Sequence, residues 1–194
     1  MAALTTKIGI VNRGLQILGM PQVNSVDSND RGAKAMRSAY DQIFLAELRA
    51  HTWNFSIKRA NLAVDPTAPI FGKTKAFQLP GDYLFLAPDE TTFGMPQKRD
   101  YNIEGRFIIT ELDAPLPIRY VSSNITEGDF DPLFAEAFST SLAEATCEEL
   151  TNSNTKLLAV QTRYVKIIND AKKRNAIENA PVKAPLASTI AVRI

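Results

Sequence analysis

His51 and Cys147 are the single histidine and the single cysteine of the sequence. Metal sites built on two histidines are therefore excluded, and no partner residues are visible that would make either side chain a catalytic nucleophile or base. His51 falls at the expected end of a helix, where the helix dipole favours an imidazolium, so we expect a structural role. Cys147 has no second Cys or His at motif distance and is expected to be a small buried thiol.

Two further patterns have the spacing of chemical sites but lack essential members. Glu144 and Glu148 would share one face of a helix, but a di-metal bundle also needs a Glu-x-x-His motif elsewhere, and the sequence has none. An acidic stripe that faces solvent or an interface is expected instead. Gly72-Lys73-Thr74 ends like a phosphate-binding loop, but Thr67 stands where that loop requires glycine. We expect no catalytic, cofactor-binding or metal-ligating residue, and no cofactor.

The composition is that of an ordinary globular protein, with 45% hydrophobic and 22% charged residues. No apolar stretch reaches the roughly 18 residues of a membrane span, and the first residues lack the pattern of a signal peptide. A single cysteine fits folding in the reducing cytoplasm. The net charge of +1 differs from that of dedicated nucleic-acid binders, which need an excess of Lys and Arg to contact phosphates.

Charge is unevenly distributed in the second half of the chain. Residues 122–153 contain seven acidic residues and no Lys or Arg, a net charge of −7. Residues 154–194 contain eight basic and two acidic residues, a net charge of +6. Two interpretations follow. Adjacent antiparallel helices of one subunit would complement each other, or oppositely charged faces of neighbouring subunits would meet in an oligomer.

Four segments have apolar residues at the period of an amphipathic helix: residues 5–18, 31–50, 132–150 and 154–177. Thr5 or Thr6 would cap the first helix, and Gly19 would end it. Asp131, followed by proline, is a preferred start for the third helix, and Asn154 would cap the fourth.

Residues 53–121 alternate between short apolar runs and turn residues, which predicts a small antiparallel β insert. The expected strands and hairpins are Trp53–Ile57, Ala76–Leu86 with a turn at Pro80-Gly81, Tyr101–Ile109 with Gly105 at the tip, and Ile118–Val121. The predicted fold is therefore α+β. Residues 1–52 and 122–178 would form a four-helix antiparallel bundle, with the β insert between its second and third helices.

Residues 179–194 are predicted to be an extended C-terminal arm. Pro181 and Pro185 disfavour a helix, and the last residues alternate like a strand. The arm would pair with its own β insert or, as we favour, with a neighbouring subunit or another protein. The basic cluster of residues 172–174 would contact a partner or DNA, or simply meet the dipole at its helix end. The predicted partner-binding residues are Leu186, Ile190, Val192, Arg193, Ile194, Lys172, Lys173 and Arg174.

Four stretches follow one another along nearly the whole chain in a familiar order. They are Leu18–Pro21 before a helix containing Arg37, Tyr40 and Asp41; His51–Ala60 with its Trp and aromatic pair; Phe77–Leu86 with its Leu-Pro and Asp; and Asp131-Pro132 before an Ala- and Glu-rich helix, a long helix and a loose arm. This succession resembles the podovirus head-to-tail adaptor family, also called tail tubular protein A, a head-tail connector.

The resemblance implies a structural protein of the virion and not an enzyme. Such adaptors assemble as a ring of about twelve copies, a dodecamer, in the neck of a tailed bacteriophage. The portal protein would bind on one side and the tail nozzle protein on the other. DNA would pass through the lumen during ejection without specific recognition, and no membrane would be involved.

Other functions remain as alternatives. A different connector ring, such as a stopper or tail terminator, would differ in the neighbour that it binds. A virion-associated cell-wall hydrolase would need two opposed carboxylates in a cleft, for which Glu47 and Asp82 are the candidates. A stand-alone nucleic-acid module would have to bind duplex DNA tightly despite the near-neutral charge.

We predict that a variant without residues 181–194 is a folded monomer that no longer binds portal, because the arm supplies the contact. Circular dichroism would measure the fold and co-sedimentation with purified portal the binding. Undiminished binding of the truncated protein would refute the arm hypothesis.

Overall fold

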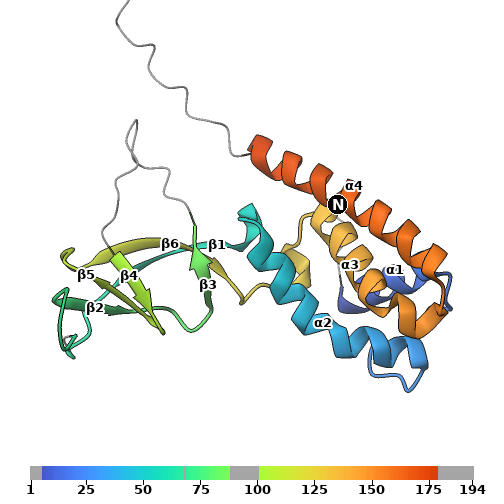
Figure 1. Cartoon of the computed structure of the whole chain (residues 1–194), viewed down its shortest axis with the longest axis horizontal. Helices are drawn as coiled ribbons and strands as arrows, with labels where there is room; N and C mark the ends of the chain where they lie inside the picture. Colours follow the sequence, from blue (N-terminus) through green and yellow to red (C-terminus); the bar gives the residue numbers. More distant parts are fainter. Residues whose placement is uncertain (1–5, 68, 88–100, 179–194) are drawn as a thin grey trace, which may run out of the picture.

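The computed structural model describes residues 6–67, 69–87 and 101–178 (Figure 1). The helices in these ranges are α1 Lys7–Leu18, α2 Arg31–Ala50, α3 Pro132–Thr151 and α4 Asn154–Glu178. The strands are β1 Ile57–Leu62, β2 Lys75–Gln78, β3 Tyr83–Leu86, β4 Tyr101–Glu104, β5 Phe107–Thr110 and β6 Leu116–Ser122. Short 3-10 turns at Asn54–Ser56 and Glu127–Asp129 link the helical part to the strands. The predicted C-terminal arm lies outside the described residues.

The predicted four-helix antiparallel bundle is wrong. In such a bundle each helix packs against two neighbours around a shared core. Here α3 is central, and α1, α2 and α4 each pack against it. The sequence pattern was misleading because it identified only one apolar face on α3, whereas small residues such as Ala137 and Ala143 are buried on its other faces. Ala145, one of the apolar residues of this helix, is exposed.

The polar side chains on α3 are compatible with its burial because they bond to their own helix. The hydroxyls of Ser139, Thr140 and Thr146 each donate to the backbone carbonyl four residues earlier, at 2.8 Å. These bonds satisfy the hydroxyls within their own helix, and the Thr146 hydroxyl also lies 3.6 Å from the sulfur of Met36 on α2. Small residues also allow close approach, since a Cβ at Gly14 of α1 would lie 3.2 Å from the backbone oxygen of Ser139.

The helix ends follow the sequence signals in most cases. Thr6 accepts a bond from the backbone N–H of Gly9, and Gly19 ends α1 with a left-handed φ of 76°. Asp131 caps α3 as predicted. The predicted cap at Asn154 is wrong, because Asn154 is already the first helical residue. The hydroxyl of Ser153 accepts the bond from the N–H of Lys156 instead, at 3.3 Å.

All the strands lie between α2 and α3, as the predicted β insert requires. They form two separate sheets, which the sequence did not predict. One has the antiparallel order β1-β6-β3 and the other β2-β5-β4. Their apolar faces share a core that includes Leu62, Phe77, Ile108 and Ile118. The predicted strand Trp53–Ile57 is wrong, because the chain makes a 3-10 turn there and β1 starts only at its last residue.

We predict that Gly14→Ala destabilises the protein by about 2 kcal/mol, despite the higher helix propensity of alanine. The added methyl group would press against the backbone of α3 and the Met36 side chain, which lies 3.1 Å from the same point. Gly81→Ala, at an exposed turn position where a Cβ would meet nothing within 4 Å, is the control and should stabilise by about 0.4–1 kcal/mol. Urea denaturation measures both, and equal effects would contradict the close packing of α1 and α3.

Candidate interaction surfaces

A pocket of about 220 Å³ lies where the end of α2 meets the start of α3 and the end of α4. It is lined by residues 53–55, residues 129–131, Asn175 and Glu178. Three of its aromatic side chains pack together. The rings of Trp53 and Phe55 stack with centroids 6.3 Å apart, and those of Phe55 and Phe130 lie 5.7 Å apart. Trp53 and Phe130 are buried, so the inner wall of the pocket is a rigid aromatic surface.

Carboxylates form the outer part of the same pocket, where Asp129 and Glu178 are exposed and Asp131 is half-buried. No Lys or Arg is among the lining residues. The hydroxyl and the backbone N–H of Thr126 donate to Asp129 at 2.7 and 3.1 Å. These bonds lower the pKa of Asp129, which keeps it ionised at neutral pH. The pocket therefore combines an aromatic inner wall with an anionic rim.

Asn175 fastens the last turns of α4 to the end of α2. Its Oδ1 accepts from the backbone N–H of Asn54 at 2.8 Å, and its Nδ2 donates to the carbonyl of Thr52 at 2.9 Å. The backbone carbonyl of Asn175 accepts from the side chain of Asn54 at 3.0 Å. The first two bonds need opposite ends of the amide, so they define its orientation.

This orientation determines the protonation state of His51. Nδ2 of Asn175 lies 3.1 Å from Nε2 of His51, and because an amide nitrogen only donates, Nε2 must accept. Burial lowers the pKa of His51, and the charge of Lys172 lowers it further. The imidazolium expected from the sequence is therefore wrong. His51 is a neutral imidazole that joins α2 to α4.

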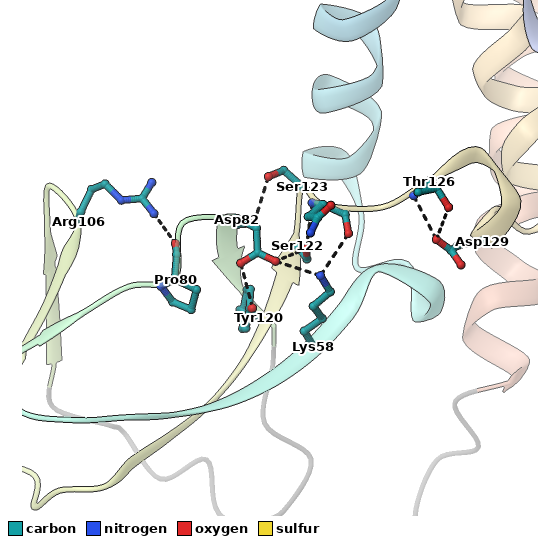
Figure 2. Close-up of polar contacts among 10 residues, drawn as sticks. Lys58, Pro80, Asp82, Arg106, Tyr120, Ser122, Ser123, Thr126 and Asp129 are labelled. Carbon is teal, nitrogen blue, oxygen red and sulfur yellow. Dashed lines mark hydrogen bonds and ion pairs between the residues drawn. The ribbon is translucent and has the colours of Figure 1, made fainter. Parts of the chain in front are cut away.

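Asp82, just before β3, holds the first sheet together (Figure 2). Its carboxylate accepts from Ser122 at 2.7 Å, Lys58 at 3.0 Å and Tyr120 at 3.1 Å. Burial raises the pKa of Asp82, but the bonds from Ser122, Lys58 and Tyr120 outweigh it and bring the pKa to about 2. Asp82 is therefore a structural anion that joins β1, β3 and β6.

Glu47 and Asp82, the carboxylates considered for a hydrolase, have separate roles. Glu47 is only 5% exposed on α2, and its Oε1 accepts from the Tyr164 hydroxyl of α4 at 2.8 Å. Burial and the charge of Glu47 raise the pKa of Tyr164. Neither carboxylate lines the pocket. Among the described residues, no group of three or more His, Cys, Asp or Glu is placed to hold a metal ion.

The opposite charges of α3 and α4 meet within the chain at Glu136. Its carboxylate forms a two-bond pair with Arg13 of α1, at 2.6 and 2.8 Å, and accepts from Arg163 of α4 at 2.7 Å. Hydrogen bonding to Arg13 lowers the pKa of Glu136 against the effect of burial. The interpretation in which adjacent helices complement each other therefore holds at this position. Glu148 and Glu149 are exposed, so part of the acidic surface faces outward.

The predicted partner-binding residues fall into two groups. Leu186, Ile190, Val192, Arg193 and Ile194 lie outside the described residues. The basic cluster lies on α4, and the four described residues that follow it contain no basic residue. Lys172 is half-buried toward His51, whereas Lys173 and Arg174 are exposed.

The other sequence candidates are structural or surface residues. Cys147 is completely buried, as predicted, with its Sγ 3.4 Å from the Thr151 hydroxyl. Gly72-Lys73-Thr74 lies in the loop between β1 and β2, and no helix follows it as a phosphate-binding loop requires. In the described part of the chain, no helix is both long enough and apolar enough to cross a membrane.

Large apolar side chains are exposed on α4 and on the β1–β2 loop. Leu158 and Val165, 64% and 56% exposed, are seven residues apart and share one face of α4, and Ile177 nearer its end is 68% exposed. No helix of the described chain covers Leu158 or Val165. Ile70 and Phe71, on the loop, were not singled out in the sequence because no periodic pattern contains them.

Comparison with known proteins adds no relative, since neither a protein-family model nor a curated protein matches this chain.

We predict that acid weakens the contact between α2 and α4. The folded-state pKa of His51 is below its ordinary value of about 6.5, so the unfolded chain takes up the proton first. The stability contributed by neutral His51 is complete above pH 6.5 and is lost as the pH falls below it. Unfolding free energies between pH 7.5 and 5 should therefore decrease, and His51→Gln should reduce that decrease. The proton spectrum of the single histidine should titrate below pH 6.5. A midpoint at or above that value would contradict the neutral, accepting ring.

Proposed function

We propose that this chain is the structural subunit of the head-to-tail adaptor ring of a tailed bacteriophage. About twelve copies would form the ring, a dodecamer, in the neck of the virion. The portal protein would bind one side and the tail nozzle protein the other, and DNA would leave through the lumen. The subunit acts by holding its neighbours in place and carries out no reaction.

One observation carries this proposal: the five most exposed large apolar side chains of the described residues lie on two separate elements, α4 and the β1–β2 loop (Figure 1). Leu158, Val165 and Ile177 are on α4, which belongs to the helical part of the molecule, and Ile70 and Phe71 are on the loop between β1 and β2. Exposed apolar side chains that are neighbours, as Ile70 and Phe71 are, mark contacts with other molecules. A subunit with two separate contact regions can join two different neighbours, which is what a ring or connector requires.

The sequence resemblance and the charge distribution support the same function. The four stretches that resemble adaptors extend over the helices and parts of both sheets. The near-neutral net charge fits a lumen that passes DNA without binding it tightly. The hydrogen-bonded connections at Asn175, Glu136 and Asp82 hold the helices and strands in fixed positions, as a subunit that orients its neighbours requires.

Reconstitution with the purified portal of the same phage tests the proposal. We expect the full chain to bind portal and to form a closed ring whose mass, measured by native mass spectrometry, corresponds to about twelve copies. Electron microscopy would locate the ring between portal and nozzle. Binding only to a tail tube or to another connector would identify a stopper or terminator, and release of fragments from purified cell wall would identify a hydrolase. Either result would overturn the proposal.

A further inference from the structure

Strand β4 is the edge strand of the second sheet, whose order is β2-β5-β4 (Figure 1). All four of its residues pair with β5 without a bulge, and it contains no proline or lysine. Bulges, prolines and lysines are the features that commonly prevent an edge strand from pairing with another chain. In the described part of the chain, the outer side of β4 therefore presents backbone N–H and C=O groups to which one more strand can bond.

The core that the two sheets share is incomplete at this edge. Ile103 on β4 pairs with Ile108 on β5, so the two side chains lie on the same face of the sheet. Ile108 is 2% exposed within the core, whereas Ile103 is 45% exposed at its margin. Tyr101 shares the face of Ile103 and packs against the same core. An apolar side chain on a further strand would cover Ile103 and extend the core.

The opposite face of β4 is polar. Asn102 and Glu104 alternate with the two apolar residues, and both are exposed. The carboxylate of Glu104 makes no hydrogen bond or ion pair with the residues that the structure describes. A strand that fits this edge therefore needs apolar residues on one face and a basic residue on the other.

The end of the chain has this pattern. Residues 190–193 read Ile-Ala-Val-Arg, with large apolar residues at the first and third positions, as in β4. In a parallel alignment with β4, Val192 falls beside Ile103 and Arg193 falls beside Glu104. The whole segment after α4 contains two basic residues and no acidic residue. Segment and edge are therefore complementary in apolar pattern and in charge.

The segment leaves the described part of the chain from a fixed point. Glu178, the last residue of α4, accepts a bond from the side chain of Asn54 at 3.1 Å, close to the start of β1 in the other sheet. Residues 179–189 can span at most about 40 Å. Pro181 and Pro185 in this spacer favour an extended path, which suits reaching another subunit better than turning back.

We propose that residues 190–193 of one subunit add a parallel strand to β4 of the next subunit. Val192 covers Ile103, and Arg193 pairs with Glu104. The donated segment and the accepting edge are different surfaces, so the contact is head to tail. Such contacts between identical subunits close into a ring when the rotation permits. This inference rests on the proposed ring assembly and specifies a contact within it.

Disulfide cross-linking in the assembled ring tests the position of the added strand. Cys147 is completely buried, so introduced cysteines react only with each other. Subunits with Ile103→Cys are mixed with subunits with Val192→Cys, assembled on portal and oxidised. We expect a covalent dimer only in the mixed sample. In the matched control, Leu112→Cys, at a similarly exposed apolar position outside β4, replaces Ile103→Cys and should give no dimer.

Substitutions measure how much the contact contributes. Ile103→Lys should weaken association of subunits on portal by at least about fivefold, because it removes the apolar contact and places a charge at the edge. Leu112→Lys is the matched control and should change association by less than about twofold. Circular dichroism verifies that both variants fold.

A charge exchange tests the ion pair at exposed positions, where folding is not at risk. Glu104→Arg should weaken association by about threefold, and less in high salt. Adding Arg193→Glu to the same chain should restore it, because the pair is then reversed and not lost. A double variant that associates no better than Glu104→Arg alone would contradict this pair and the parallel alignment.

The possible results separate this inference from the proposed function. A wild-type ring without the mixed cross-link, or with Ile103→Lys assembling normally, overturns the strand contact and leaves the adaptor proposal in place. A disulfide within single chains that carry both cysteines, formed without portal, would put the segment on its own sheet and also overturn the inference. Dimers of Ile103→Cys alone would indicate that two β4 edges pair, with the same consequence. If the wild-type chain forms no ring on portal, both proposals fail.

Discussion

The burial of α3 is the constraint on which the helical part of this protein depends. Three other helices pack against it, so its buried positions are occupied by apolar or small residues. Its buried hydroxyl-bearing residues, Ser139, Thr140 and Thr146, are tolerated because each bonds to the carbonyl one turn earlier. Close approach then needs Gly14 on α1, where even a methyl group would meet the backbone of α3. Stability is therefore concentrated in close packing at the centre.

Polar connections fix how the outer elements are placed around this centre. Glu136 pairs with Arg13 and Arg163 and so joins α1, α3 and α4. Asn175 joins the end of α4 to the end of α2, and its orientation requires a neutral His51. Asp82 plays the same part in the first sheet. Each connection is a charged or amide group with several partners, which specifies geometry more strictly than apolar contact does.

The rigid placement of the helices and strands fixes where the exposed apolar residues lie on the molecule. The apolar residues of the β1–β2 loop and the apolar face of α4 lie on separate elements, and the anionic aromatic pocket lies among the helix ends. Because the elements between them are held by defined bonds, the distances between these surfaces are set by the fold. A subunit of this kind is suited to join neighbours at fixed angles, the property that a ring needs.

The sequence by itself determined the elements whose signals are local. The bounds of α2, the caps at Thr6 and Asp131, and the hairpin turn at Gly105 follow from periodicity, capping chemistry and glycine's access to positive φ. Only the tertiary structure decided that α3 is central, that the strands divide into two sheets, and that His51 is neutral. These depend on contacts between residues far apart in sequence, such as His51 with Asn175, and no local pattern records which distant partner a side chain will meet. The pocket was missed for the same reason, since its walls come from three separate segments that only folding brings together.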